Sequence, residues 1–455
     1  MKNRSFLALF SLLIVLSMVL GACQSASATP AATDAPAVDE PAAVEPTAVE
    51  AQPETPTEAP AASEPVKITF WHQYDSKNAE MIDQFVKEFN DSHPDIQVEA
   101  VIQPSYDEYK TLIQTSMLSK TTPDVASVDL IWVPGIATQD ALLPLDDYIT
   151  NDADFNMDDF YPMLAEYDVM GGKRYAMPMS ANNMQLIWNK DLFEKAGLDP
   201  EKAPTTWDEM QSMAEQCSNP DEGIVGFEYY TQPTGEGITW QFQVWLWAAG
   251  GEFLNADNTA AAFNTPEGLK ALTYVSNMLQ GHGSVAAPWG AFGDGKACMQ
   301  LDGSWLFGYR KDASFQWGIA PVPAPEGGTT ASNVGGERLI VFKTSQHPEA
   351  ASEFIKFMTS PEVQMRWDKE TGFMPVLKSV GESDEYLTWA QDTEPRMLPF
   401  INGMEFAHTR PATPLYNQVS DAFSREIQRA YVGEITPEEA LANAETAVND
   451  ILKGE

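Results

Sequence analysis

The sequence predicts an α/β fold of two lobes, and two observations carry that prediction. Segments typical of strands and helices alternate from residue 66 onward, as they do in parallel βαβ units. About 390 residues follow residue 65, which is too many for one core of ordinary size and enough for two. We therefore expect a mostly parallel sheet flanked by helices in each lobe.

The first two βαβ units are visible in the order of apolar residues. Residues 66–71 read as a strand, the apolar residues at 81, 82, 85 and 89 share one helical face, and residues 96–100 alternate again. A helix around 109–113 and a short apolar strand from 123 toward 132 follow. Parallel sheets place ligand sites at the carboxyl ends of their strands. The candidates for the edge of such a crevice are Trp71, His72, Tyr74, Tyr106, Asp129 and Trp132.

The first 23 residues have the pattern of a bacterial lipoprotein signal. Lys2 and Arg4 precede an apolar stretch at 6–20 that is too short for an anchored transmembrane span, and a Gly-Ala pair leads directly to Cys23. We expect cleavage before Cys23, a lipid on its sulfur, and a chain tethered outside the cytoplasmic membrane. The alternatives are an ordinary signal peptide or a short membrane anchor.

Residues 24–65 are predicted to be a disordered tether. They contain eight prolines and eight acidic residues and no basic or aromatic residue. Such a composition cannot form a core, and proline together with like charges favours an extended spacer.

Composition excludes some classes of partner. Against 66 acidic residues the chain has only 27 Lys and Arg, so a nucleic-acid partner is not expected. With Cys23 assigned to lipid, only Cys217 and Cys298 remain. They form one disulfide or are two buried small residues, because the sequence does not give their separation.

No motif gives positive support for catalysis, a metal or a cofactor. Residues 290–296 have the spacing of a phosphate-binding loop, but position 297 is Ala where a hydroxyl is needed, and the strand follows the loop instead of preceding it. Residues 152–163 begin like a calcium loop but have Met at the required Gly and Glu positions. The five histidines show no zinc-ligand spacing.

From residue 173 onward, short motifs occur in a characteristic order. They are Tyr-x-x-Pro at 175–178, Asn-Lys-Asp-Leu-Phe at 189–193, Pro-Thr-Thr-Trp at 204–207, Gly-Gly at 250–251, Phe-Asn-Thr-Pro-Glu at 263–267, Gly-Ser-Trp at 303–305, Gly-Gly at 335–336 and His-Pro-Glu-Ala-Ala at 347–351. Together they resemble the extracellular solute-binding proteins of bacterial ABC importers, in the sugar-binding branch similar to maltose-binding protein. The resemblance covers nearly all of residues 66–452; Trp188 and Cys298 depart from it.

The resemblance implies a type II periplasmic-binding-protein fold with two discontinuous lobes joined by hinge crossings. The first lobe would comprise residues 66–179 and 338–394, and the second residues 180–337 and 395–455. The start of a helix at 207 also follows from the residues themselves. Thr206 can cap the helix, and the side chain of Glu209, three residues later, can accept a hydrogen bond from the backbone N–H of Thr206.

Aromatic residues are the best candidates for ligand contacts, because the C–H face of a sugar packs on a ring while its hydroxyls bond to polar side chains. Trp240 and Trp247 share a helical face, and we expect Trp240 to reach the ligand and Trp247 to be core. The resemblance implies stacking roles for Trp305 and Tyr416, and a hydrogen-bonding role for Arg410. Asn182 and Gly336 would lie at the crossings.

We therefore expect an extracytoplasmic, lipid-anchored, monomeric protein that captures an oligosaccharide between two lobes and delivers it to an ABC permease, without catalysis, cofactor or metal. The alternatives are an extracellular glycan-active enzyme, a binding protein for a polyamine, polyol or peptide, or a structural surface lipoprotein.

Overall fold

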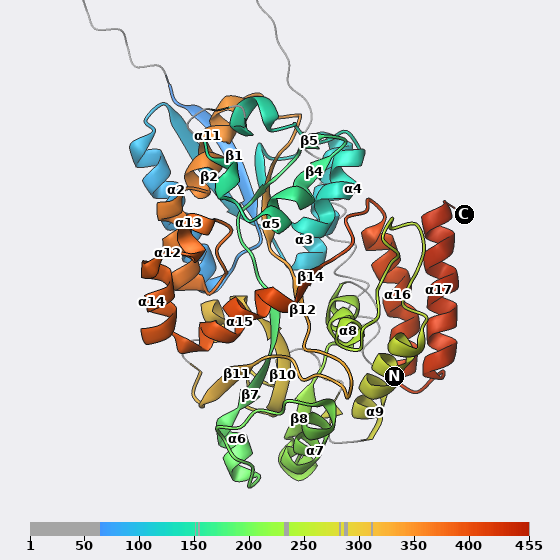
Figure 1. Ribbon diagram of the computed structural model, residues 1–455. Helices are drawn as coiled ribbons and strands as arrows, with labels where there is room; N and C mark the ends of the chain where they lie inside the picture. Colours follow the sequence, from blue (N-terminus) through green and yellow to red (C-terminus); the bar gives the residue numbers. More distant parts are fainter. Residues whose placement is uncertain are drawn as a thin grey trace, which may run out of the picture. The chain divides into compact units, whose positions relative to one another are not determined.

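The computed structural model describes residues 64–150, 152, 155–231, 236–281, 284–285, 290–310 and 313–454. The expected signal segment with Cys23 lies outside these residues, as does the expected tether up to residue 63. Residues 62–455 form one compact unit (Figure 1). Within the described ranges, no helix combines the length and the apolar character that crossing a bilayer requires.

The first sheet contains both predicted βαβ units. Its strand order is β2-β1-β3-β13-β6, and β1 pairs in parallel with both β2 and β3. Helix α2 lies between β1 and β2 in the chain and buries the predicted face at residues 81, 82, 85 and 89. The bounds are β1 Val66–His72, α2 Ser76–Ser92, β2 Ile96–Ile102, α3 Tyr106–Ser119, β3 Val125–Asp129, β6 Met177–Pro178 and β13 Glu337–Val341.

The second sheet has the order β11-β7-β10-β8-β9. Its strand β10 is buried along its whole length, including the polar residues Gln300 and Asp302, which are hydrogen-bonded to each other. The bounds are β7 Met184–Asn189, β8 Val225–Glu228, β9 Ser284–Val285, β10 Ala297–Gly303 and β11 Trp317–Ala320. Figure 1 shows the strands of the two sheets in separate halves of the compact unit.

The two-lobed α/β architecture is as predicted, but the sheets are mixed and not mostly parallel. In each sheet two strand pairs are parallel and two are antiparallel. In the first sheet the antiparallel pairs involve β13, which enters from the side of the second sheet and therefore runs against β3 and β6. A chain that crosses between lobes must return, and its returning strand reverses direction.

The remaining elements surround the sheets. Helices α11 and α12 contact α2 beside the first sheet, and α6 and α7 contact strands of the second. The bounds are α4 Val133–Thr138, α5 Pro162–Ala165, β4 Val169–Met170, β5 Lys173–Arg174, α6 Lys190–Lys195, α7 Trp207–Cys217, α8 Gly237–Ala248, α9 Pro266–Gly281, α10 Phe307–Arg310, β12 Ser332–Val334, α11 Pro348–Met358, α12 Pro361–Thr371, α13 Lys378–Gly381, α14 Asp384–Asp392, α15 Leu398–Gly403, β14 Ala407–Thr409, α16 Tyr416–Tyr431 and α17 Pro437–Lys453.

The cap predicted for α7 is present in a modified form. The Thr206 hydroxyl oxygen accepts a hydrogen bond from the Glu209 backbone N–H at 3.1 Å. The Glu209 carboxylate accepts from the backbone N–H and the hydroxyl of Thr205, one residue earlier than the capping box requires. These bonds satisfy N–H groups that the first turn of a helix leaves without partners.

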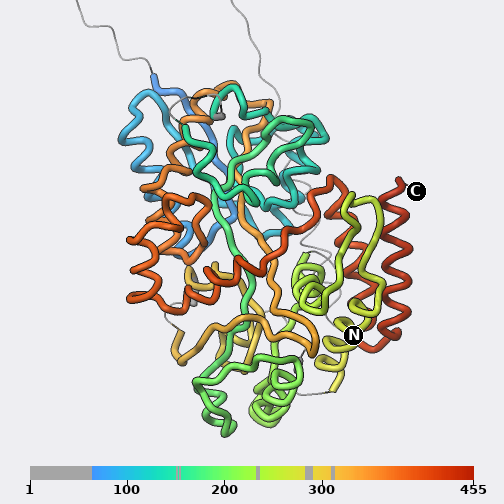
Figure 2. Tube along the Cα trace, in the orientation of Figure 1, coloured from blue at the N-terminus to red at the C-terminus, as the bar shows by residue number. Residues whose placement is uncertain are grey.

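The chain passes between the sheets in adjacent segments. The segment before β7 and the segment before β13 run side by side (Figure 2), and the backbones of Asn182 and Gly335 exchange hydrogen bonds of 3.2 and 2.9 Å. Gly336 has a φ of +131°, and a Cβ there would lie 2.0 Å from the carbonyl oxygen of Ser180. Only glycine permits both this backbone conformation and this approach. The lobe boundaries given above stay predictions.

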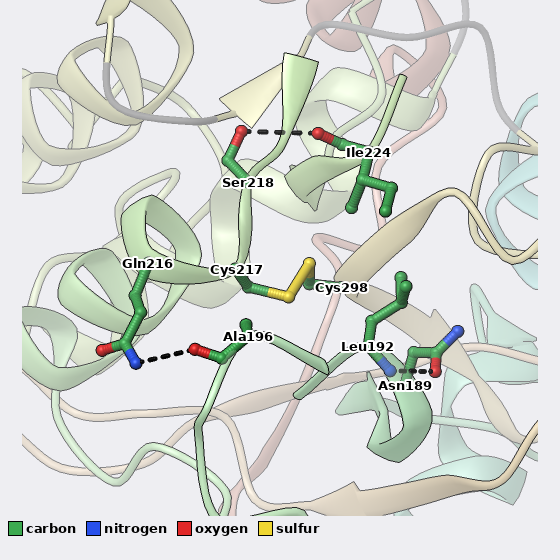
Figure 3. The surroundings of a disulfide bond; sticks show 8 residues. All are labelled: Asn189, Leu192, Ala196, Gln216, Cys217, Ser218, Ile224 and Cys298. Atoms are coloured by element: carbon green, nitrogen blue, oxygen red, sulfur yellow. Dashed lines mark hydrogen bonds between the residues drawn. A yellow bond between two sulfur atoms is a disulfide. The ribbon is translucent and has the colours of Figure 1, made fainter. Parts of the chain in front are cut away.

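Cys217 and Cys298 form a disulfide bond (Figure 3). It joins the last residue of α7 to β10, with a Cα–Cα distance of 6.3 Å, and closes a segment with a sequence separation of 81. Both residues are buried. Of the two possibilities that the sequence leaves open, the structure contains the disulfide.

Candidate functional site

A cavity of about 440 Å³ lies where strands of both sheets end. Gln73 follows β1, Asp129 ends β3, Tyr230 follows β8 and Trp305 follows β10. This is the position at which α/β sheets commonly bind ligands. The lining residues are Gln73, Tyr106, Asp107, Asp129, Asn182, Met184, Tyr230, Glu236, Gly237, Trp240, Gln241, Trp305, Gly336, Glu337 and Arg410.

Seven of the residues predicted from the sequence line this one cavity. They come from separate parts of the chain: the start of α3, the end of β3, the two crossings, the first turn of α8, and the regions after β10 and β14. The seven are Tyr106, Asp129, Asn182, Trp240, Trp305, Gly336 and Arg410. Their ligand contacts stay predictions.

Three predicted residues near the first strand lie outside the cavity lining. Trp71 is half-buried against the core, and its carbonyl oxygen accepts a hydrogen bond from the Tyr109 hydroxyl. His72 and Tyr74 are buried and stack on one another at 5.8 Å behind the site. His72 belongs to the buried face of β1, and Trp71, on the partly exposed face, packs against the core, so only residue 73 after this strand reaches the cavity.

Trp132 and Tyr416 lie one layer behind the cavity. Trp132 is buried under the ring of Tyr106, with a centroid separation of 4.8 Å. Tyr106 therefore lines the cavity where Trp132 was expected to line it. Tyr416 is fully buried, and its hydroxyl donates to the Glu236 carboxylate at 2.8 Å. Tyr416 therefore supports a lining residue and does not line the cavity itself.

A buried arginine joins two carboxylates at the cavity wall. The Arg410 guanidinium donates to Asp129 Oδ1 at 2.9 Å and to Glu236 Oε1 at 3.1 Å. It also lies 4.0 Å above the ring of Trp240. Burial alone lowers the pKa of Arg410, but the two carboxylates raise it, so the guanidinium stays charged. Burial raises the pKa of Glu236, and Arg410 partly offsets this rise.

A second acidic group lies at the crossings. The Ser180 hydroxyl donates to the Glu337 carboxylate, and the Glu337 backbone N–H donates to the Ser180 hydroxyl oxygen at 3.0 Å. Burial, with a smaller contribution from the neighbouring charge of Asp129, raises the pKa of Glu337 to about 7, although the hydrogen bond from Ser180 lowers it. Near neutral pH this carboxyl therefore exchanges between an acceptor-only form and a form that can also donate.

Aromatic rings and polar atoms without partners share the wall. Trp240 and Trp305 meet at 6.2 Å with their planes tilted by 56°, and Tyr230 lies on the same lining. The Asn182 Oδ1, Trp240 Nε1, Arg410 Nε and Gln73 Oε1 atoms are buried and have no hydrogen-bond partner among the described residues. Buried polar atoms normally have partners, so these atoms favour a ligand that supplies hydroxyl groups.

Sequence reasoning did not identify several lining residues. Glu236 and Glu337 are two of 66 acidic residues, and composition alone cannot single them out. Their neighbours carried the usable signals, because Gly336 directly precedes Glu337 and Trp240 lies one helical turn after Glu236. The others not identified are Gln73, Asp107, Met184, Tyr230, Gly237 and Gln241.

The loop with phosphate-loop spacing has an internal partner. The buried Glu228 carboxylate accepts hydrogen bonds from the backbone N–H groups of Gly290, Ala291 and Phe292, the last at 2.7 Å. The N–H groups that would cradle a phosphate therefore bind a carboxylate of the chain itself. No group of three or more His, Cys, Asp or Glu residues suited to a metal occurs in the described part of the chain.

Comparisons with known proteins point to one family. A family model described as bacterial extracellular solute-binding protein matches residues 75–365. The crystal structure of the cyclic alpha-maltosyl-1,6-maltose binding protein from Arthrobacter globiformis is 42% identical, with a TM-score of 0.75, and the match covers 86% of this chain and 100% of that chain. An ABC substrate-binding protein from Listeria monocytogenes in complex with cycloalternan is 26% identical, with a TM-score of 0.77 and coverage of 86% and 99%. The sn-glycerol-3-phosphate-binding periplasmic protein of Pectobacterium atrosepticum is 23% identical, with coverage of 85% and 91%.

Proposed function

The chain belongs to the bacterial extracellular solute-binding proteins, and from that membership we propose that it binds an oligosaccharide in the cavity between its two sheets. Proteins of this family bind and do not catalyse, so the glycan-active enzyme is set aside. The observation that supports a sugar is the combination of four aromatic rings with buried polar atoms that lack partners among the described residues. Rings pack against sugar C–H faces, and the polar atoms take hydroxyl groups.

The charge of the wall argues for a neutral ligand. Among the described lining residues Arg410 is the only cation, and Asp129 and Glu236 already neutralise it. A phosphate group would face those two carboxylates together with Glu337 and Asp107. Like charges at short range in a partly buried site are strongly unfavourable. We therefore propose an uncharged sugar and not a glycerol phosphate, although one relative is named for that ligand.

The first ligand to test is cyclic alpha-maltosyl-1,6-maltose. The relative that is named for this sugar is 42% identical to this chain, and the match covers the whole of the relative and 86% of this chain. Linear maltotriose, glycerol 3-phosphate and spermidine complete the panel, because they separate ring shape, anionic charge and cationic charge. Spermidine is included because four acidic residues line an aromatic cavity, which is the setting in which a polyamine would bind.

The experiment is a calorimetric and tryptophan-fluorescence titration of the purified chain with this panel, with chromatography of the sugars afterward. We expect saturable binding of one uncharged sugar without turnover. Trp305→Ala should weaken that binding by about tenfold or more, whereas Trp389→Ala, in α14 and outside the cavity, should change it by less than about twofold. Binding of spermidine or glycerol 3-phosphate alone would contradict the proposal.

We also propose that Cys23 carries a lipid and that the loaded protein delivers its sugar to a membrane-embedded ABC permease. The signal pattern at residues 1–23 supports the anchor, and the family supports the permease. A ligand that contacts both lobes favours the closed form, which is the form a permease can distinguish. Cys23→Ala should release the protein into the soluble fraction; retention of the variant in the membrane fraction would contradict the anchor.

A further inference from the structure

We propose that three glycines, Gly237, Gly303 and Gly335, are positioning residues that set the planes of three of the four rings in the cavity wall. Each is paired with one ring: Gly237 with Tyr230, Gly303 with Trp305 and Gly335 with Trp240. The proposal deepens the proposed function, because these rings are the surfaces on which the sugar would lie. We call these three residues the glycine seats.

The distances at the glycine seats leave no room for a methyl group. A Cβ on Gly303 would lie 2.0 Å from Cζ3 of Trp305, and a Cβ on Gly237 would lie 2.3 Å from Cδ1 of Tyr230. A Cβ on Gly335 would lie 2.3 Å from Cη2 of Trp240. Cβ atoms essentially never come within 3.0 Å of such neighbours. Each ring therefore rests directly on the backbone at a glycine.

Backbone conformation does not explain these glycines. None of the three has a positive φ, and Gly303 has φ −94° and ψ 169°, an extended conformation open to any residue. Gly237 begins α8, where alanine is a better helix former than glycine. At Gly237 and Gly303 the contact with the ring excludes a side chain, and at Gly335 the ring of Trp240 excludes it together with Asn182 Oδ1, which would lie 2.4 Å from a Cβ.

Two of the rings also constrain each other, so a shift at Gly303 or Gly335 changes the positions of both Trp305 and Trp240. Trp240 and Trp305 are in contact at 6.2 Å, and the Arg410 guanidinium lies over the face of Trp240 at 4.0 Å. Trp240 is thus held between Arg410 and the backbone at Gly335. A methyl group beneath Trp305 would push that ring toward the cavity or toward Trp240. The angle between the two indole planes would change, and with it the shape of sugar that fits.

The test is a double-mutant cycle with a matched control. Gly303→Ala, Trp305→Ala and the double variant are titrated with cyclic alpha-maltosyl-1,6-maltose, and Gly281→Ala serves as the control because a Cβ there meets nothing within 4 Å. We expect Gly303→Ala to weaken binding about tenfold, Gly281→Ala to leave it unchanged, and the double variant to bind no more weakly than Trp305→Ala. Independent, additive losses would overturn the proposal.

A measurement without sugar keeps the proposal separate from the proposed function. The fluorescence of Trp305, taken as the difference between each protein and its Trp305→Ala partner, should shift in wavelength and in acrylamide quenching when Gly303 becomes Ala. An unchanged Trp305 signal would overturn the proposal that Gly303 positions this ring, independently of which ligand the protein binds. If the signal shifts but wild-type protein binds no sugar, the proposed function fails and the positioning role stands.

Gly237→Ala with Tyr230→Ala repeats the cycle at the start of α8. Because a Cβ at residue 237 would lie 2.3 Å from Cδ1 of Tyr230, Gly237→Ala should displace that ring and weaken sugar binding when Tyr230 is present. In the Tyr230→Ala background, where the ring is absent, Gly237→Ala should leave both the melting temperature and the affinity unchanged, because a helix tolerates alanine at its first residue. Equal affinity of Gly237→Ala and wild type would overturn the proposal at this position.

Discussion

Glu337 offers a direct test of how burial controls charge at this site. Its carboxyl bonds to Ser180 where two crossings touch, and burial raises its pKa from 4.5 to about 7. The folded state therefore holds a proton on Glu337 over a pH range in which the unfolded chain has lost it. The contribution of Glu337 to stability is fully present below about pH 4.5 and is lost as the pH rises through 7.

The size of the effect follows from the shift. A pKa displaced from 4.5 to about 7 corresponds to about 3 kcal/mol, at about 1.4 kcal/mol per unit. Although protein atoms enclose the carboxyl, the residue keeps some accessible surface in the cavity. Water that enters the cavity reaches the carboxyl and screens its charge. We therefore expect the free energy of unfolding to change by about 1 to 3 kcal/mol.

The assay is the free energy of unfolding of wild type and Glu337→Gln, measured by urea titration from about pH 4 to about pH 8. Glutamine keeps the hydrogen bond to Ser180 and cannot ionise, so wild type should lose stability relative to the variant as the pH rises. Asp83→Asn, at an exposed position on α2, controls for the loss of one acidic residue and should give a flat difference. A flat difference for Glu337→Gln as well would refute the reasoning.

Three further predictions concern stability. Burial lowers the pKa of His72 from 6.5 to about 4, so its contribution is lost as the pH falls through that range, and His72→Phe should reduce the acid-side loss of unfolding free energy by up to about 3 kcal/mol. Replacing Cys217 and Cys298 by Ala should lower the free energy of unfolding by about 4 kcal/mol, measured by urea titration against the oxidised wild type; no change would mean that the bond adds no constraint. Glu228→Ala leaves the N–H groups of the loop after Gly290 without their acceptor and should cost about 3 kcal/mol by the same measurement, with hydrogen exchange at Phe292 speeding up.

The order of elements was predictable because it depends on local patterns, whereas the depth of each side chain was not. The rule that ligands bind at strand ends located Asp129 correctly beside the cavity. It also pointed to Trp71 and His72, but His72 lies on the buried face of β1 and Trp71 is half-buried against the core. Which residue of a strand end finally reaches the cavity depends on neighbours from distant parts of the chain, as Tyr106 shows by covering Trp132.

The acidic residues of the site also show that a local sequence pattern does not reveal contacts between distant parts of the chain. Glu236 gains its role from Arg410, which lies 174 positions away in the sequence, and no local pattern marks that pairing. The resemblance in the motifs pointed to Arg410 and Tyr416, and both lie at this cluster, but one lines the cavity and the other supports it from behind. Likewise, the spacing of Cys217 and Cys298 gave no distance, so only the fold could decide that they bond.

The internal bonds of the wall determine which of its groups can select a ligand. Arg410, Asp129 and Glu236 satisfy much of one another's bonding capacity, so their positions are fixed by contacts within the chain. A wall fixed in this way reduces the ordering that binding requires. In the proposed sugar complex, the groups expected to discriminate between ligands are those left without partners among the described residues, such as Asn182 Oδ1 and Trp240 Nε1. A ligand with a hydroxyl opposite each of them completes their bonds, whereas an analogue lacking one hydroxyl leaves a buried polar atom unpaired, at a cost of about 1 to 3 kcal/mol. On this proposal, the rings on their glycines would select the shape of the sugar, and these few unpaired atoms would select the position of each hydroxyl.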